Sequence, residues 1–187
     1  MLIQKRGKGL KILAIVLVIG LLGGYVFYFT GLVDTKPRDE RTTRITSEEA
    51  DEEAEKVNQL SDKLFRLDSQ GEVQVGALLV NPIEDDPDYL VFKTQFNTHS
   101  VDLDGYAFKN MAVFKTSDGL VLKDEIIWEK ADGDGHHYLG NYKIPKKING
   151  KPVIQDSTNS IELIIVKVDG IEERPLVWEK EVLGLLR

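Results

Sequence analysis

The hydrophobic positions of the chain change their spacing twice, and the first zone is an uninterrupted apolar run. Residues 12–33, ILAIVLVIGLLGGYVFYFTGLV, contain no charged side chain. A helix of about 20 apolar residues spans the roughly 30 Å hydrocarbon core of a bilayer. The run is longer than the apolar core of a cleaved signal peptide, about 7–15 residues, and it ends in aromatic residues typical of a membrane interface. It therefore predicts an uncleaved transmembrane signal anchor.

Basic residues before this run predict its orientation. Four of them, and no acidic residue, precede it: Lys5, Arg6, Lys8 and Lys11. Because basic flanks stay on the cytoplasmic side, residues 1–11 are predicted to be a cytoplasmic tail, and the C-terminal part of a single-pass protein of the cell membrane lies outside the cytoplasm. Gly20 and Gly24 have the spacing that lets two membrane helices approach closely, which offers one route to a homodimer.

The second zone is a polar linker followed by a helical repeat. Residues 34–46 are charged and polar, and Pro37 prevents the membrane helix from continuing. Apolar residues then recur at intervals of three and four, as on one face of a helix: Ala50, Ala54, Val57, Leu60, Leu64 and Leu67. This pattern predicts a stalk helix, 47–70. Its apolar face either packs on the chain's own domain or pairs with a second copy, so that the 47–69 helix is another route to a homodimer.

The third zone, from residue 72, alternates apolar and polar positions as strands do. Six alternating runs are separated by turn signals rich in Asn, Asp and Gly: Val73–Leu79, Leu90–Phe96, Met111–Lys115, Val121–Trp128, His137–Ile144 and Ile161–Val168. A tight hairpin at Asp169–Gly170 leads to a returning strand with Pro175 and Trp178. The fold is therefore predicted to be mainly β, with residues 72–187 an immunoglobulin-like β-sandwich preceded by a transmembrane helix and a stalk helix.

Composition narrows the function of this domain. The chain has 187 residues and no cysteine, which excludes disulfides, a thiol nucleophile and cysteine-bound metals. After residue 33 the chain carries 20 basic and 31 acidic residues, and so large an acidic excess disfavours nucleic acid as a partner. No G-x-S-x-G, H-E-x-x-H or phosphate-binding glycine loop occurs in the sequence. We therefore expect a protein that is not an enzyme.

All three histidines lie in the predicted β domain, near several aspartates. Imidazole is a common ligand of copper and zinc. Neighbours along a strand point to opposite faces, so adjacent histidines share a site only where the backbone is irregular, as glycines at 133 and 135 allow. Copper or zinc is predicted ahead of calcium, since neither D-x-D-G stretch continues as an EF-hand. The predicted metal ligands are His99, His136, His137, Asp102, Asp104 and Asp134. In the alternative interpretation, the histidines only hold loops in place.

Three stretches carry a resemblance to a known group of proteins: FKTQFNTHSVDLDGYAFKNMAVF, GHHYLGNYKIP and IELIIVKVDGIEERPLVWE. Over residues 88–179 the chain resembles uncharacterised prokaryotic proteins that have an N-terminal anchor and one extracytoplasmic β-sandwich domain. THSVDLD and GHH are the most specific motifs. The resemblance implies an architecture rather than an activity, and it directs attention to His99, Asp102, His136 and His137.

These observations lead to a ranked set of functions. The first is a membrane-tethered extracytoplasmic binding module that binds a metal ion through its histidines. The second is a structural or assembly subunit of a cell-envelope complex, without a metal site, whose partner is another envelope protein. The third is a metal-dependent hydrolase on the same residues, which needs an open coordination position on the ion.

Overall fold

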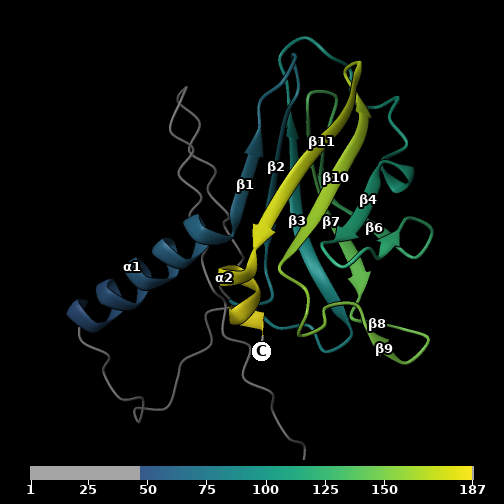
Figure 1. The fold of residues 1–187 in the computed structure, drawn as a ribbon. Helices are drawn as coiled ribbons and strands as arrows, with labels where there is room; N and C mark the ends of the chain where they lie inside the picture. The colour runs from purple at the N-terminus through teal and green to yellow at the C-terminus, as the bar shows by residue number, and fades with distance from the viewer. Residues whose placement is uncertain (1–46, 187) are drawn as a thin grey trace, which may run out of the picture. The chain divides into compact units, whose positions relative to one another are not determined.

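The computed structural model describes residues 47–186, which fall into two units, 47–59 and 60–186 (Figure 1). The predicted cytoplasmic tail, signal anchor and linker, with Gly20 and Gly24, lie outside the described residues. Between residues 47 and 186, no helix has both the length and the apolar character needed to cross a membrane.

Helix α1 (Ser47–Leu64) ends earlier than its apolar spacing predicted. The chain passes directly into strand β1 (Phe65–Asp68), so the prediction of helix to residue 70 and of a domain beginning at 72 was wrong. Leu67 misled the prediction because it fits a helical stripe, yet it lies in β1 with 53% of its surface exposed. Leu64 is fully buried in the core, so the last turn of α1 docks on the domain. Pairing of two copies through the 47–69 helix stays a prediction.

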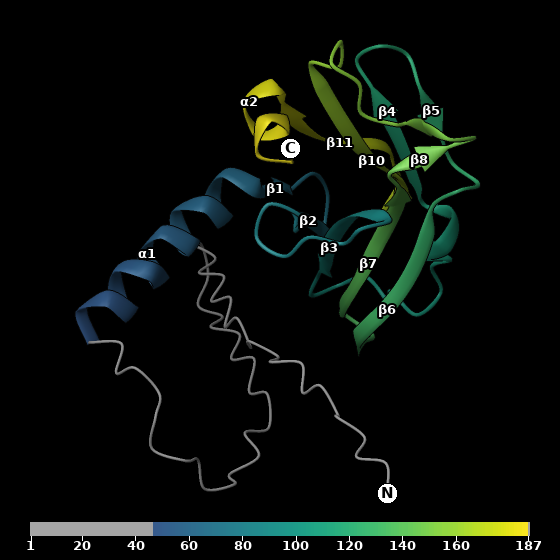
Figure 2. The same cartoon turned by 90° about the horizontal axis from the view of Figure 1, so that it is seen from below.

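The described part of the chain is mainly β, with antiparallel sheets, as the alternating runs predicted (Figure 2). One sheet has the strand order β1-β2-β3-β7-β6, the second has the order β11-β10-β4-β5, and β8 pairs with β9. The remaining elements are β2 (Gln74–Leu79), β3 (Tyr89–Asn97), η1 (Phe108–Asn110), β4 (Ala112–Thr116), β5 (Val121–Leu122), β6 (Ile127–Asp134), β7 (His137–Pro145), β8 (Lys147–Ile148), β9 (Lys151–Pro152), β10 (Ser160–Val168), β11 (Ile171–Glu179), α2 (Lys180–Leu183) and η2 (Gly184–Leu186).

One predicted strand, Val121–Trp128, is in fact two. β5 ends at Leu122, and a turn closed by the Ile126 N–H donating to the Lys123 carbonyl separates it from β6. The apolar residues on both sides of this turn conceal it in the sequence. β6 then continues to Asp134, so it includes most of the DGDG stretch, residues 132–135, that separates two of the predicted alternating runs.

The two large sheets face each other across one hydrophobic core. The ring of Phe92 on β3 lies 4.9 Å from that of Trp178 on β11 and 6.3 Å from that of Phe114 on β4. Trp178 is fully buried, and its Nε1–H donates to the Leu64 carbonyl oxygen at 2.6 Å. A buried indole needs such a partner, and this bond ties the chain's entry into the domain to the last strand.

β1 and β11 are edge strands of different sheets, and in the described residues they do not pair with each other through the backbone. Side chains join them instead. Arg66 on β1 donates from Nε to the Val177 carbonyl at 2.6 Å. In return, the fully buried Arg174 on β11 donates from Nη1 to Asp68 at 2.6 Å and to the Val73 carbonyl at 3.0 Å. These arginines close the gap between the two sheets on one side.

Strand direction gives the domain two different ends. β1, β3 and β10 run away from the point where the chain enters at Leu64, and β11 returns to that point and leads into α2 (Figure 1). The opposite end, at the top of Figure 1, is called the loop end here. Its loops are tied together, since the Glu72 N–H donates to Asp169 and the Asp169 N–H donates to the Tyr106 hydroxyl. The loop end comprises residues 69–73, 97–107, 134–137 and 169–170.

Candidate functional site: the histidines of the loop end

Strand register places a row of polar side chains at the loop end. Asn97, the last residue of β3, lies opposite His137, the first residue of β7, and His137 in turn lies opposite Asp134 on β6. Residues directly opposite each other in antiparallel strands project from the same face of the sheet. Their chain neighbours Phe96 and Tyr138 are buried in the core, so the row lies on the outer face.

His99 joins this row from the loop that follows β3. Its ring centre lies 6.3 Å from that of His137, and the two ring planes are nearly perpendicular, at 83°. His137 itself is oriented by Asn97, whose Oδ1 lies 3.1 Å from the Nδ1 of His137. When Nδ1 carries the proton of this bond, the lone pair of His137 is on Nε2.

The backbone on both sides of His99 is held in place. The Thr98 N–H donates to the His136 carbonyl at 3.0 Å, and Thr98 is almost completely buried. The Thr98 hydroxyl oxygen then accepts hydrogen bonds from the N–H groups of Ser100 and Val101, each at 3.2 Å. The position of His99 is therefore set by the turn that contains it.

His136 makes a different contact from its neighbour. Its Nδ1 lies 2.9 Å from the carbonyl oxygen of Val101, whereas His137 contacts Asn97 and His99. Gly133 and Gly135, with φ of +93° and +55°, form the irregular backbone that the sequence predicted around this hairpin. The contacts of His136 are those of a residue that holds the loop 98–107 against the hairpin.

Asp104 also ties the loop to the hairpin. One of its carboxylate oxygens accepts hydrogen bonds from the Tyr138 hydroxyl at 2.6 Å and from the Gly135 N–H at 2.9 Å. The Tyr138 bond is the main cause of a lowered pKa of Asp104, and the same bond raises the pKa of Tyr138 to about 12. Asp102 accepts a hydrogen bond from the Asp104 N–H at 3.0 Å. These two carboxylates organise the loop end.

The six predicted metal ligands thus gather at one end of the domain but have different contacts. His99 and His137 form a pair, Asp134 lies beside them in the register, and the other three make the loop contacts described above. Across residues 47–186, no three histidine, cysteine, aspartate or glutamate side chains form a group that could hold a metal ion. Metal binding by the predicted set stays a prediction. Asn97, Thr98 and Tyr138 support the site, and the sequence analysis missed them because their roles depend on pairing between distant strands.

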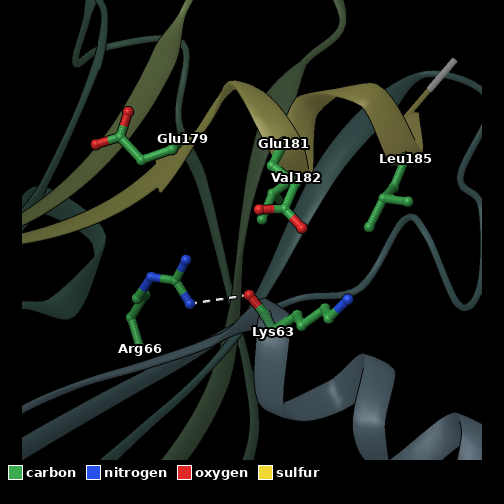
Figure 3. Close-up of a pocket in the computed structure, with 6 residues that line it drawn as sticks. All are labelled: Lys63, Arg66, Glu179, Glu181, Val182 and Leu185. Atoms are coloured by element: carbon green, nitrogen blue, oxygen red, sulfur yellow. Dashed lines mark hydrogen bonds between the residues drawn. The ribbon is translucent and has the colours of Figure 1, made fainter.

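A pocket of about 330 Å³ lies at the opposite end of the domain (Figure 3). The pocket is lined by two apolar side chains, Val182 and Leu185, and by four charged ones: Lys63, Arg66, Glu179 and Glu181. The Arg66 guanidinium donates to the carbonyl oxygens of Lys63 and Phe65, at 2.9 and 2.8 Å. Burial lowers the pKa of Arg66, and the negative charge of Glu179 opposes that shift. The Arg66 side chain therefore stabilises the start of β1. None of the predicted metal ligands lines this pocket.

No family model, curated protein or solved structure matches this chain. The resemblance to anchored prokaryotic proteins therefore stays a prediction.

Proposed function

We propose that this chain is a membrane-tethered extracytoplasmic binding module that takes a transition-metal ion, copper or zinc, at His99 and His137. The observation that carries the proposal is the pair of rings 6.3 Å apart, with His137 oriented by Asn97 at 3.1 Å. Histidine ligands of metals commonly donate the proton of the other ring nitrogen to an oxygen acceptor, which fixes the tautomer and the ring orientation. The Asn97 contact is of that kind.

The architecture is part of the same proposal. Residues 12–33 anchor the chain in the cell membrane, residues 1–11 remain in the cytoplasm, and the domain is an immunoglobulin-like β-sandwich outside it. Two antiparallel sheets around one core support the β-sandwich assignment. Strand direction supports a binding role for the loop end, because the chain enters the domain at the other end.

A binding role is favoured over a catalytic one by the surroundings of the two rings. The pocket lined by Arg66 and Glu179 lies at the other end of the domain, and its lining includes none of the histidines. Small-molecule sites are usually concave, whereas His137 is an exposed residue on the outer face of a sheet. We therefore propose that the module binds the ion without turning over a substrate.

Calorimetric titration of the full chain tests the proposal. The chain is purified in detergent micelles without a polyhistidine tag and titrated with Cu(II), Zn(II) and Ca(II). We expect one Cu(II) or Zn(II) ion to bind per chain, and His99→Ala and His137→Ala each to weaken that binding at least about tenfold. His136→Ala is the matched control and should retain binding, because His136 contacts Val101 instead.

Two results would contradict the proposal. Equal binding by all three variants would assign the ion to another part of the chain. Failure of the unmodified chain to bind copper or zinc would favour the assembly subunit without a metal site. Circular dichroism of each variant shows whether lost binding reflects lost structure.

A further inference from the structure

We propose that the pocket between the end of α1 and α2 binds a small zwitterion with an aliphatic side chain, of the class of the free α-amino acids. The pocket lies at the other end of the domain from the histidines, so this site is independent of the proposed metal site. Three properties of the pocket carry the proposal: the placement of its charges, the unused donors of Arg66, and its size.

The charges of the pocket come from two different parts of the chain. Lys63 and Arg66 come from the junction of α1 and β1, whereas Glu179 and Glu181 come from the end of β11 and the start of α2 (Figure 3). A ligand between them meets basic groups on one side and carboxylates on the other. A molecule that carries both a carboxylate and an ammonium group can form charge-assisted hydrogen bonds with both sides at once.

These charged groups are available to a ligand. In the part of the chain that the structure describes, none of the four takes part in an ion pair. The charged ends of Lys63, Glu179 and Glu181 also make no hydrogen bond to another described residue. Pairing within the pocket therefore does not use up its charges.

Arg66 offers donors in a fixed position. Its Nε donates to the Val177 carbonyl at 2.6 Å, and its Nη1 donates to the carbonyls of Lys63 and Phe65. A guanidinium has five N–H groups, so these bonds use three of them and hold the group in place. The two N–H groups of Nη2 have no partner among residues 47–186, and they lie on the side that faces β11 and α2 (Figure 3). A group that is already ordered binds a carboxylate without paying the entropy of being immobilised.

The size and the apolar lining of the pocket narrow the class of ligand. Its volume of about 330 Å³ is at the lower end of the range for small-molecule pockets, roughly 300–1,000 Å³, which favours one amino acid over a peptide. Val182 is nearly buried, but Leu185 leaves 45% of its surface exposed. An aliphatic ligand side chain that covered Leu185 would remove apolar surface from water. Leucine combines such a side chain with both charges.

Titration of the full chain with L-leucine, in micelles of a non-ionic detergent, tests the proposal. Calorimetry measures the affinity, and tryptophan fluorescence gives a second readout, since the Arg66 guanidinium carbon lies 5.7 Å from the centre of the Trp178 ring. We expect saturable binding of one leucine per chain. Leucinamide, which lacks the carboxylate, and N-acetyl-leucine, which lacks the ammonium group, should each bind at least about tenfold more weakly, because each loses charge-assisted hydrogen bonds.

A double variant identifies the acidic side of the site. Glu179→Gln/Glu181→Gln should weaken leucine binding at least about tenfold but leave the binding of N-acetyl-leucine unchanged, since that ligand has no ammonium group. Both glutamates are exposed, so the fold should be retained. The matched control is Glu172→Gln/Glu173→Gln, which removes two exposed carboxylates from the other end of β11 and should bind leucine as the unmodified chain does.

Three results would overturn the proposal. The first is a lack of saturable leucine binding by the unmodified chain. The second is equal binding of leucine and its two analogues, because the pocket would then not recognise a zwitterion. The third is unchanged leucine binding in the Glu179→Gln/Glu181→Gln variant, which would place the ligand elsewhere. His99→Ala should bind leucine normally, so this test and the metal titration succeed or fail separately.

Discussion

The guanidinium of Arg174 lies 2.6 Å from the carboxylate of Asp68, and this ion pair joins the edge strands of the two sheets. The Arg174 side chain is fully buried and that of Asp68 is only 12% exposed. Burying two charges is costly, but removing one of them is costlier because the other stays buried without a counter-charge. The pair is therefore a point at which a single substitution has a large effect on folding.

Asp68→Ala should destabilise the domain by about 3–5 kcal/mol, because it leaves the Arg174 charge uncompensated. Urea denaturation of the full chain in micelles, followed by tryptophan fluorescence, measures the change. The matched control is Asp85→Ala, since Asp85 pairs with Lys146 at the same 2.6 Å but is 67% exposed; because solvent screens such a pair, its loss should change the free energy of unfolding far less. If the two variants lost similar amounts of unfolding free energy, the assignment of Asp68 as a buried counter-charge would be refuted.

Acid should weaken the fold through the same carboxylate. Burial alone would raise the pKa of Asp68, but hydrogen bonds from Gln70 and Arg174 outweigh burial, and the pKa is lowered from 3.8. A carboxyl whose pKa is lower in the folded state stabilises it above its unfolded pKa, and this contribution is lost as the pH falls through the folded pKa. The free energy of unfolding should therefore fall below pH 3.8, less steeply in Asp68→Asn than in the unmodified chain.

Gly133→Ala should weaken both the fold and metal binding. Gly133 has φ of +93°, and a Cβ there would collide with the carbonyl oxygen of His137, which is backbone and cannot give way cheaply. We expect a lower free energy of unfolding and a weaker copper titration, because the strand that carries His137 must shift. Gly105→Ala provides the comparison, since no atom lies within 4 Å of a Cβ at that position. If Gly133→Ala left the free energy of unfolding unchanged, that result would contradict the described backbone of this hairpin.

Tyr138→Phe should raise the pKa of Asp104 towards its ordinary value. The Tyr138 hydroxyl is the main cause of the lowered pKa, and removing it leaves the Gly135 N–H as the closest donor. Carbon-detected NMR titration of the aspartate carboxyls measures the shift. Tyr142→Phe, which removes a hydroxyl that donates to the Phe108 carbonyl instead, should leave the pKa of Asp104 unchanged.

Long alternating runs made the sheet strands predictable from the sequence. The runs beginning near Leu90, His137 and Ile161 correspond to β3, β7 and β10, and the Asp169–Gly170 hairpin forms as predicted, with positive φ at both residues. Short elements were harder to predict from the sequence. The spacing of Leu67 fits a helix and a strand equally well, so it could not show where α1 ends.

The candidate site was predictable only in part, for a related reason. Sequence placed the histidines near strand ends, but the contact between Asn97 and His137 joins residues 40 positions apart. It depends on the pairing of β3 with β7, whereas β4, β5 and β6 intervene in the chain. No local pattern encodes which of two adjacent histidines will face such a partner.

Strand direction has a mechanical consequence for the proposed anchoring of the chain at its N-terminus. A partner that pulls on the loop end, against a tether that enters at Leu64, loads β1 along its length. The hydrogen bonds between Phe65–Asp68 and β2 run across that direction, so they resist the load together instead of breaking one after another. With the proposed anchor, the domain would resist shear between the point of entry at Leu64 and its loop end.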